Sequence, residues 1–566
     1  MQIKSLPLSH LQVAQTTHAK PKLSLNLRIV AVTLITALTL GCNSQSKSVS
    51  TADVSAGADV TAESSVTQQI TNVDILIANG DVYLGDNTGK QALDVGLCGN
   101  VICALVPSGT GKLQAKRVID AQGKIVNAGF IDPHTHTLAE LGSKTKNANL
   151  NYLMQGVTTV VNGNDGGSPV DIAKTASKLT QNGIGTNVAF FIGHNSVRTA
   201  VMGRENRHAS PTEIAGMEAL VEKAMLDGAV GLSSGLYYVP GSYANTEEVI
   251  ALARVAAKYK GIYDTHLRDE STFNIGFLAA LDEAINIAEQ ADIHLHLAHI
   301  KALGVDVWGQ SKDAIKKVES AQQRGVSISA DQYPWLASGT KLHSAIMPKW
   351  VMAGSKTEFY QRLNLAEHQS RLQREIKENI RRRGGPSALL ITEFSDQTLV
   401  GKTLEQVAEE RNLSPVDTAI ALVQLGDIRV ASFNMSADDL ANFVVQPWVV
   451  TSSDGTNGHP RKYGSFPKKY QDIVLEKQLL SLEDFIIKSS SQTADILGLQ
   501  NRGKLKHGFA ADIIVWDKNV FRSNATFQQW NNLASGIQTV IVNGQIAVDA
   551  GEFQQVLAGE FVKSNR

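Results

Sequence analysis

The sequence predicts an α/β protein built on a (β/α)₈ TIM barrel, with a small β-sandwich domain formed by both chain ends and an insertion between strands 7 and 8. Three observations support this prediction. Strand-like and helical segments alternate through the middle of the chain, short β-rich segments occupy both ends, and one connection is far longer than the others. Alternation of this kind is typical of parallel βα units, and eight units close a barrel.

Eight apolar segments are the candidate barrel strands. They are expected to end at Ile131–Asp132, Val160–Val161, Phe190–Ile192, Val230–Ser233, Gly261–Thr265, His294–Ala298, Val326–Ala330 and Trp448–Ser452. Two helices between them have clear starts. Ser210-Pro211-Thr212-Glu213 is a capping box with proline at the first helical position, and its helix should end at Gly228. Asn245 should begin a helix that runs to about Lys260.

Short β segments lie at both ends of the predicted barrel. They are Val73–Ala78, Asp94–Leu97, Ile102–Val106 and Arg117–Asp120 on one side, and Ala511–Trp516 and Gln538–Val542 on the other. We therefore expect residues 72–127 and 501–560 to form one β-sandwich, and residues 128–500 to form the barrel.

Cys98 and Cys103 flank a Gly99-Asn100 turn in the first of these regions. A two-residue turn would place Cys98 opposite Val101, so the sequence leaves open whether the cysteines form a disulfide or remain free on their strands.

The seventh and eighth strands are separated by an unusually long stretch, residues 336–446. Barrel connections usually have only a few residues outside their helix. We expect an inserted subdomain over the barrel mouth, with a charged helix at about residues 366–383.

The N-terminus predicts export. Lys20, Lys22 and Arg28 precede an apolar run at residues 29–40, which is too short to span a bilayer and suits a signal peptide. The run ends at Gly41-Cys42, which resembles a bacterial lipobox, although Thr39, two residues before the glycine, stands where leucine is usual.

We expect residues 1–42 to be a lipoprotein signal peptide with Cys42 lipidated, and residues 43–71, which are rich in Ser, Thr and Ala, to be a flexible tether. The protein would then be lipid-anchored in the bacterial envelope, at the outer membrane facing the periplasm. Plain secretion after cleavage nearby is the alternative.

Charge excludes one class of partner. The chain has 53 basic and 54 acidic side chains and a formal net charge of −1. Binding to a phosphate backbone requires a basic surface, so no nucleic-acid partner is expected. The composition leaves the oligomeric state open.

Histidines and aspartates follow five of the predicted strands, where barrels carry their functional groups. They are His134 and His136 after the first strand, Asp165 after the second, His266 and His299 after the fifth and sixth, and Asp454 after the eighth. Imidazoles suit zinc, and a carboxylate can bridge two ions. The sequence therefore predicts a site for one or two Zn²⁺ ions, although other divalent metals would also fit.

Several segments around these residues resemble the amidohydrolase superfamily and, more closely, its D-aminoacylase (N-acyl-D-amino-acid deacylase) family. Residues 129–136, Gly-Phe-Ile-Asp-Pro-His-Thr-His, resemble the opening metal motif of the superfamily. The segments that resemble D-aminoacylases are residues 231–238, 265–270, 298–301, 453–455 and 459–461, and the likeness extends over about residues 72–555.

The resemblance implies a role for each candidate. His134 and His136 would bind a weaker-held metal, and His266 and His299 a tighter-held one. Asp454 would be the catalytic acid and base.

One position departs from the family pattern. Where the family has a cysteine as the shared metal ligand, this chain has Asp165, a harder ligand that leaves the metal preference open. Residues 229–238 contain no lysine, which disfavours hydantoinase-like and dihydroorotase-like enzymes that bridge their metals through a carbamylated lysine.

The resemblance also implies a substrate. Lys301, Tyr238 and Tyr333 would hold its α-carboxylate, and Lys341 and His343 are candidates for setting side-chain preference. The expected reaction is hydrolysis of N-acyl-D-amino acids, in which Asp454 takes a proton from the attacking water and gives it to the leaving amine. The alternatives are a dipeptidase acting on D-amino-acid-containing dipeptides and a non-catalytic peptide-binding lipoprotein.

Overall fold

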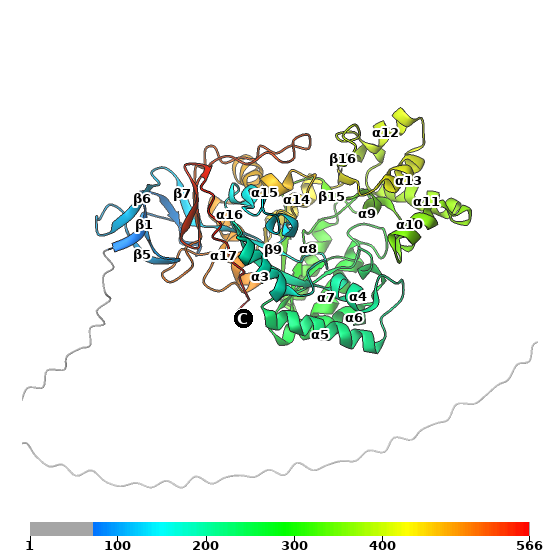
Figure 1. Cartoon of the computed structure of the whole chain (residues 1–566), viewed down its shortest axis with the longest axis horizontal. Coiled ribbons are helices and arrows are strands. Elements are labelled where there is room, and N and C mark those ends of the chain that lie inside the picture. The colour runs from blue at the N-terminus through cyan, green and yellow to red at the C-terminus, as the bar shows by residue number, and fades with distance from the viewer. Residues whose placement is uncertain (1–71, 565–566) are drawn as a thin grey trace, which may run out of the picture. The chain divides into compact units, whose positions relative to one another are not determined.

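The computed structural model describes residues 72–564 (Figure 1). The predicted signal peptide, Cys42 and the tether lie outside this range. Eight parallel strands form the barrel in the order β8-β9-β10-β11-β12-β13-β14-β18. Their bounds are β8 (Phe130–Asp132), β9 (Val157–Asn162), β10 (Asn187–Gly193), β11 (Gly231–Gly235), β12 (Ile262–His266), β13 (His294–Leu297), β14 (Ile328–Gln332) and β18 (Val449–Thr451). The predicted barrel is confirmed.

Two strands extend two residues beyond their predicted ends, and β9, β10 and β12 extend by one residue. β11 continues to Gly235 and pairs there with His266, and β14 continues to Gln332 and pairs with Thr451. The apolar pattern stops earlier because polar residues occupy these carboxyl ends, but the backbone ladder continues through them.

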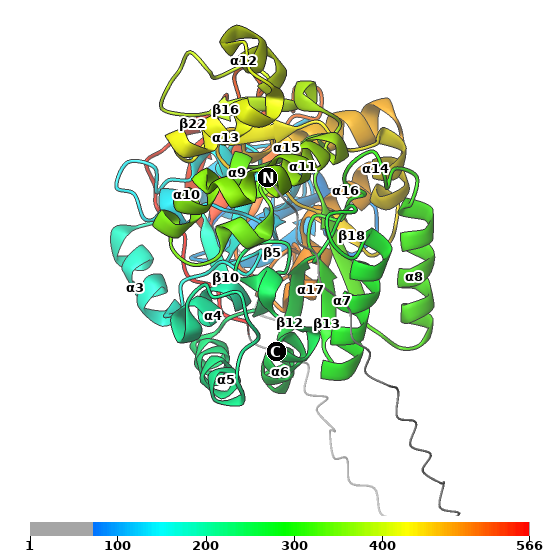
Figure 2. The ribbon, with the colours of Figure 1, turned by 90° about the vertical axis from the view of Figure 1, so that its right-hand side faces the viewer.

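Helices surround the strands, and Figure 2 shows α5 to α8 on the outside of the barrel. Ser210 caps α5 (Pro211–Asp227) through the predicted capping box, and α5 ends at Gly228. Asn245 caps α6 (Thr246–Lys258), which ends two residues before the predicted end. The remaining barrel helices are α1 (Leu138–Leu141), α2 (Leu150–Leu153), α3 (Ile172–Asn182), α4 (His194–Met202), η1 (Gly241–Tyr243), α7 (Phe277–Ala291), α8 (Ser311–Gln323), α14 (Ala437–Val444), α15 (Arg461–Lys469), η4 (Tyr470–Glu476), α16 (Leu482–Ser489) and α17 (Ser491–Leu497).

Both ends of the described chain build the β-sandwich, as predicted. One sheet is β5-β4-β1-β6 and the other is β22-β21-β20-β19-β7-β2-β3. Their strands are β1 (Asn72–Ala78), β2 (Asp81–Tyr83), β3 (Lys90–Gln91), β4 (Leu93–Cys98), β5 (Val101–Pro107), β6 (Gln114–Asp120), β7 (Ile125–Ala128), β19 (Ile513–Trp516), β20 (Ile537–Val542), β21 (Gln545–Asp549) and β22 (Glu552–Phe553). Val126 pairs with Val515 across the two chain ends, and Ile75 and Val95 of the first sheet share their buried cluster with these two valines.

Cys98 and Cys103 form a disulfide. Cys98 lies opposite Val101, as the turn predicts. The turn alone would not bring the two cysteines together, but a β-bulge follows it. Leu97 pairs with Ile102 and Gly96 pairs with Ala104, so Cys103 is the extra, unpaired residue of the bulge. Because a bulge re-aims a side chain, it allows Cys103 to reach Cys98.

The segment between β14 and β18 is the predicted insertion, with a sheet of its own in the order β15-β17-β16. Its elements are β15 (Ser338–Lys341), α9 (Leu342–Ile346), η2 (Lys349–Met352), α10 (Lys356–Asn364), α11 (Ala366–Arg382), η3 (Pro386–Ala388), β16 (Leu389–Glu393), α12 (Leu404–Arg411), α13 (Pro415–Leu425) and β17 (Arg429–Ser432). A separate buried cluster that includes Leu342, Leu372 and Val430 forms its core. The charged helix predicted near residue 366 is α11.

Within residues 72–564, the longest apolar helical stretches fall short of what crossing a membrane requires.

Candidate metal centre

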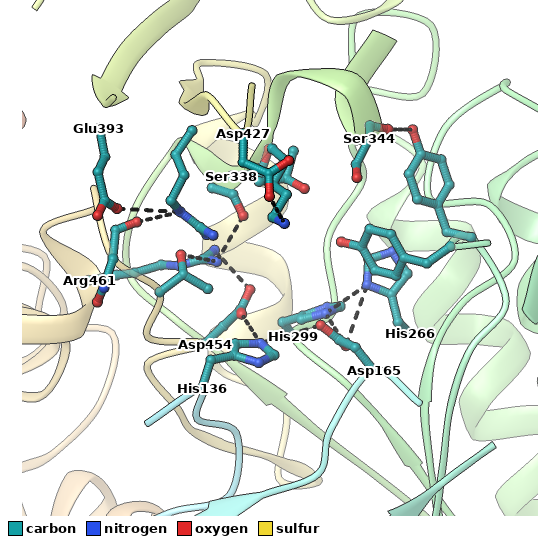
Figure 3. A pocket seen from close by; sticks show the side chains of 18 of the residues that line it. His136, Asp165, His266, His299, Ser338, Ser344, Glu393, Asp427, Asp454 and Arg461 are labelled. Atoms are coloured by element: carbon teal, nitrogen blue, oxygen red, sulfur yellow. Dashed lines mark hydrogen bonds and ion pairs between the residues drawn. The ribbon is translucent and has the colours of Figure 1, made fainter. Parts of the chain in front are cut away.

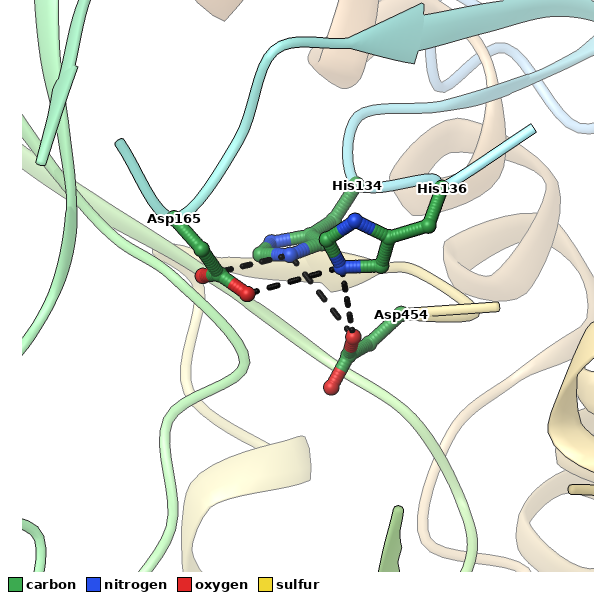
Figure 4. Close-up of side chains that lie close together, drawn as sticks. All are labelled: His134, His136, Asp165 and Asp454. Carbon is green, nitrogen blue, oxygen red and sulfur yellow. Dashed lines mark ion pairs between the residues drawn. The ribbon is translucent and has the colours of Figure 1, made fainter. Parts of the chain in front are cut away.

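Asp165 lies at the centre of a group of four histidines. It follows β9 in a left-handed conformation with φ +55°. Its Oδ1 lies 3.2 Å from His299 Nε2, 3.5 Å from His134 Nε2 and 3.6 Å from His266 Nδ1, and its Oδ2 lies 3.4 Å from His136 Nε2. One carboxylate therefore faces all four predicted histidine ligands (Figures 3 and 4).

The backbone is strained at two further members of the group. His299, two residues after β13, has φ +34°, and Asp454, three residues after β18, has φ +46°. Non-glycine residues in this region carry a conformational cost and are concentrated at functional sites. Both residues lie just beyond the carboxyl ends of barrel strands, where barrels carry their functional groups.

Asp454 lies beside the histidines of the first strand. Its Oδ1 is 3.3 Å from His136 Nε2 and 3.7 Å from His134 Nε2, and its Oδ2 is 2.8 Å from Arg461 Nη1. Burial raises the pKa of Asp454, but Arg461 and then His299 outweigh burial and hold the pKa below its usual range. Asp454 is therefore ionised at neutral pH, as a proton acceptor must be.

The six predicted ligands form two overlapping sets, and in each set the donor atoms lie within 4.8 Å of one another. One is His134, His136, Asp165 and Asp454, and the other is Asp165, His266 and His299. Both ring nitrogens of the fully buried His134 lack a hydrogen-bond partner. A buried imidazole without a partner is costly unless it binds an ion, so this donor set fits a divalent metal centre shared through Asp165. All six predicted ligands are in it.

A buried carboxylate lies beneath this group. Asp331, on β14, accepts hydrogen bonds from the backbone N of His299 (3.1 Å) and from Ser452 Oγ through its Oδ1. Its Oδ2 lies 3.0 Å from His296 Nε2 and 3.8 Å from His134 Nδ1. Sequence reasoning missed Asp331, although it is a charged residue near the end of a barrel strand, which is a signal that could have identified it.

The metal centre opens into a cavity of about 840 Å³, whose wall combines barrel loops with the insertion. Lys301 and Tyr238, two of the predicted carboxylate ligands, line the cavity. Lys301 Nζ lies 2.7 Å from Glu270 Oε1 and 2.8 Å from His299 Nδ1. Glu270 is a second residue that sequence reasoning did not single out; its place four residues after His266 was the available signal.

Tyr333, the third predicted carboxylate ligand, does not line the cavity. It is 1% exposed, and its ring lies 4.7 Å from the guanidinium carbon of Arg461. Arg461 lines the cavity in its place. Arg461 belongs to residues 459–461, which resemble a D-aminoacylase segment, but the sequence did not predict a role for it.

Of the two residues proposed for side-chain preference, only Lys341 lines the main cavity, where it pairs with Asp427 at 2.8 Å. Lys341 and His343 both line a neighbouring pocket of about 300 Å³. Burial, followed by the charge of Lys341, lowers the pKa of His343 to about 4, so this imidazole is neutral at pH 7.

The fold and the site together define a (β/α)₈-barrel metalloenzyme whose candidate metal ligands, with Asp165 common to both sets, lie at the mouth of the barrel. The chain belongs to the amidohydrolase family, which residues 117–350 and 397–548 match. It is 30% identical over 509 residues to a D-aminoacylase of Alcaligenes xylosoxydans xylosoxydans, and the match covers 83% of this chain and 93% of that protein. The predicted family is confirmed.

Among the solved structures similar to this chain are two that each have a TM-score of 0.74 and a match covering 87% of this chain and 100% of the other. One, at 28% identity, is a D-aminoacylase with a binuclear metal centre in which one metal activates and the second attenuates. The other, at 25% identity, is the N-acyl-D-glutamate deacylase of Bordetella bronchiseptica in complex with zinc and a phosphonate inhibitor that mimics the tetrahedral intermediate.

Proposed function

We propose that this protein hydrolyses the amide bond of N-acyl-D-amino acids and releases a carboxylate and a free D-amino acid. The observation that carries the proposal is the placement of Asp165 against four histidines, with Asp454 beside them at the mouth of an amidohydrolase barrel. The D-configuration of the substrate is supported by the specificity of the similar enzymes.

Zinc fits the six donor residues, with Asp165 shared between the two sets. A bound Zn²⁺ ion lowers the pKa of water and polarises a carbonyl oxygen, which are the two forms of assistance that amide hydrolysis needs. His134 and His136 on one side and His266 and His299 on the other would hold the ions.

Asp454 moves the proton. Its ionised carboxylate accepts a proton from the attacking water through Oδ1, the oxygen that faces His136. Arg461 holds Oδ2 at 2.8 Å, which fixes the orientation of the carboxylate during this transfer. The same oxygen then donates the proton to the amine as the C–N bond breaks, which returns Asp454 to its ionised state.

The substrate's α-carboxylate is bound by the cationic side of the cavity. Lys301, Tyr238 and Arg461 line the wall beside the metal ligands, and Arg461 offers a planar guanidinium suited to a carboxylate. Tyr333 acts indirectly because its ring lies against Arg461.

Cleavage is tested by supplying the purified chain with Zn²⁺ and measuring release of free amino acid from N-acetyl-D-amino acids, their L-enantiomers and D-containing dipeptides. We expect turnover of the acyl-D-amino acids, and its loss in Asp454→Asn with zinc still bound. Turnover confined to dipeptides would replace the proposal with a dipeptidase. Zinc binding without any turnover would favour a binding protein.

We also propose that the protein is exported and anchored by a lipid on Cys42. The apolar run at residues 29–40 and the following Gly41-Cys42 support export, and the Cys98–Cys103 disulfide suits an oxidising compartment. Incorporation of labelled fatty acid into the wild-type protein, and its loss in Cys42→Ser, is the expected result. An unlabelled wild-type protein in the soluble periplasmic fraction would contradict the anchor.

A further inference from the structure

The basic side chains that line the active-site cavity are not equally neutralised. Five lysine or arginine side chains line it, and four have an acidic partner: Lys301 with Glu270 at 2.7 Å, Arg461 with Asp454 at 2.8 Å, Lys341 with Asp427 at 2.8 Å, and Arg429 with Glu393 at 4.0 Å. The fifth, Arg383, forms no ion pair with any residue of the described chain.

Arg383 has only neutral partners. It follows α11 and is 3% exposed. Its Nε donates to the carbonyl oxygen of Ala345 at 2.8 Å and its Nη2 donates to the Tyr237 hydroxyl at 3.3 Å, while Nη1 is buried without a hydrogen-bond partner. A buried guanidinium with an unpaired nitrogen and no counter-charge is costly in a folded protein.

A second unpaired cation lies beside it. Lys349 Nζ is 3.4 Å from the centroid of the Tyr237 ring, and no carboxylate in residues 72–564 lies within 4.0 Å of that nitrogen. Asp269 is an acid whose charge acts on Lys349, and its Oδ2 accepts backbone N–H groups of Asn274 at 2.6 Å and Gly276 at 3.0 Å. It does not form an ion pair with either cation, so Lys349 and Arg383 share one tyrosine and have no carboxylate of residues 72–564 in direct contact.

Of the two cations, Arg383 lines the active-site cavity, whereas Lys349 lines a neighbouring pocket on the other side of Tyr237. Tyr237, which both cations contact, lies near the metal centre. The Tyr237 ring centroid is 5.7 Å from that of His266, and the Tyr237 hydroxyl donates to Ser344 O at 3.1 Å. Figure 3 shows Ser344 and His266 on one side of the cavity and Arg461 and Glu393 on the other. A substrate whose α-carboxylate is bound near Arg461 would leave the Arg383 side of the cavity free for another of its groups.

We infer that Arg383, supported by Lys349, binds a second carboxylate of the substrate, remote from the scissile amide. This inference rests on the proposed deacylase function and narrows its substrate class to dianionic N-acyl-D-amino acids. The second carboxylate belongs either to an acidic side chain or to a dicarboxylic acyl group. Both would supply an acidic partner for the guanidinium at the part of the cavity wall that Arg383 lines.

Isosteric substrate pairs test the inference without any mutation. N-acetyl-D-glutamate is compared with N-acetyl-D-glutamine, and N-succinyl-D-alanine with N-succinamoyl-D-alanine, by kcat/KM on the zinc-loaded full chain. We expect the charged member of one pair to be preferred by at least about tenfold, as a charge-assisted hydrogen bond implies. The pair that shows the preference identifies the source of the carboxylate. Equal rates within both pairs would overturn the inference and leave the deacylase function standing.

Variants locate the preference. Arg383→Met should reduce it by about 10- to 100-fold while N-acetyl-D-glutamine is still cleaved. Arg382→Met is the matched control, because Arg382 is the adjacent residue and does not line the cavity. If Arg383→Met does not fold, Lys349→Met provides the second variant. A preference that survives in folded Arg383→Met would contradict the assignment.

A binding measurement distinguishes a wrong assignment of the Arg383 subsite from a wrong assignment of the deacylase activity. If no acyl-D-amino acid is hydrolysed, calorimetric titration with the same four compounds still measures the charge preference. Preferential binding of a dicarboxylate, lost in Arg383→Met and retained in Arg382→Met, would support the subsite after the proposed function had failed. Equal binding of the charged and neutral compounds would overturn the inference.

Discussion

Replacement of Asp331 by asparagine tests whether this buried carboxylate of β14 positions the metal ligands. The Asp331 carboxylate connects three strands: it accepts the backbone N–H of His299, contacts Ser452 and His296, and faces His134 Nδ1 at 3.8 Å. A carboxylate next to one ring nitrogen of a histidine orients the ring so that the other nitrogen binds the metal. Asp331→Asn keeps the size of the side chain and removes its charge.

The size of the effect follows from these contacts. The backbone N–H of His299 needs an acceptor, so the amide oxygen should remain there and the amide NH₂ should face His134 and His296. Loss of a carboxylate partner of this kind reduces metal affinity by about 10- to 100-fold, or about 1.4–2.8 kcal/mol. A buried group left unpaired also lowers the free energy of unfolding by about 1–3 kcal/mol.

Zinc titration in metal buffers measures the first effect, and denaturant unfolding measures the second. Asp439→Asn is the control, because Asp439 is also buried and accepts two backbone N–H groups, of Gly309 at 2.8 Å and Ser311 at 3.2 Å, away from the metal ligands. We expect both variants to lose stability and only Asp331→Asn to lose zinc affinity. Unchanged zinc affinity in folded Asp331→Asn would refute the positioning role.

Four further predictions address the bridge, the proton carrier, the disulfide and a helix cap. Asp165→Ala should lose at least one zinc equivalent by metal analysis, because Asp165 belongs to both donor sets, whereas Asp165→Cys should keep zinc and discriminate more strongly against Mn²⁺, since a thiolate is softer. Asp454→Asn should lower kcat by about 10²- to 10⁴-fold with little change in KM; an unchanged kcat would remove Asp454 from the reaction. Cys98→Ser should lower the free energy of unfolding by about 2 kcal/mol, measured in urea, because the disulfide closes a short loop, and kcat should not change. Ser210→Ala removes the capping box of α5 and should cost about 1 kcal/mol in the same assay, while Ser210→Asp should restore most of it.

Much of the fold follows from local patterns in the sequence. The strands of the barrel are short, apolar and separated by helices, so their number and order could be predicted from periodicity. Ser210 and Asn245 identify two helix starts because capping depends on a few neighbouring residues. The ends of β11 and β14 could not be predicted in the same way, because pairing with neighbouring strands, rather than hydrophobicity, extends them through Gly235 and Gln332.

The candidate ligands could also be identified from the sequence, because a barrel brings the carboxyl ends of its strands to one mouth. Position after a strand was therefore sufficient to predict that His134, Asp165, His299 and Asp454 lie together. The substrate residues were less predictable. Tyr333 lies close to a strand end but points behind Arg461, and its neighbours are set by packing that no local pattern encodes.

The sequence by itself determined the class of fold, the eight-strand order, the two-ended sandwich and the identity of the six metal-ligand candidates, because each depends on residue type at a fixed distance along the chain. Only the tertiary structure decided that Asp165 faces all four histidines, that a bulge brings Cys103 to Cys98, and that Arg383 lines the cavity without a counter-charge. These features join residues far apart in the chain or depend on a local irregularity, and their distances are fixed by the packing of the barrel against its insertion and by strand register.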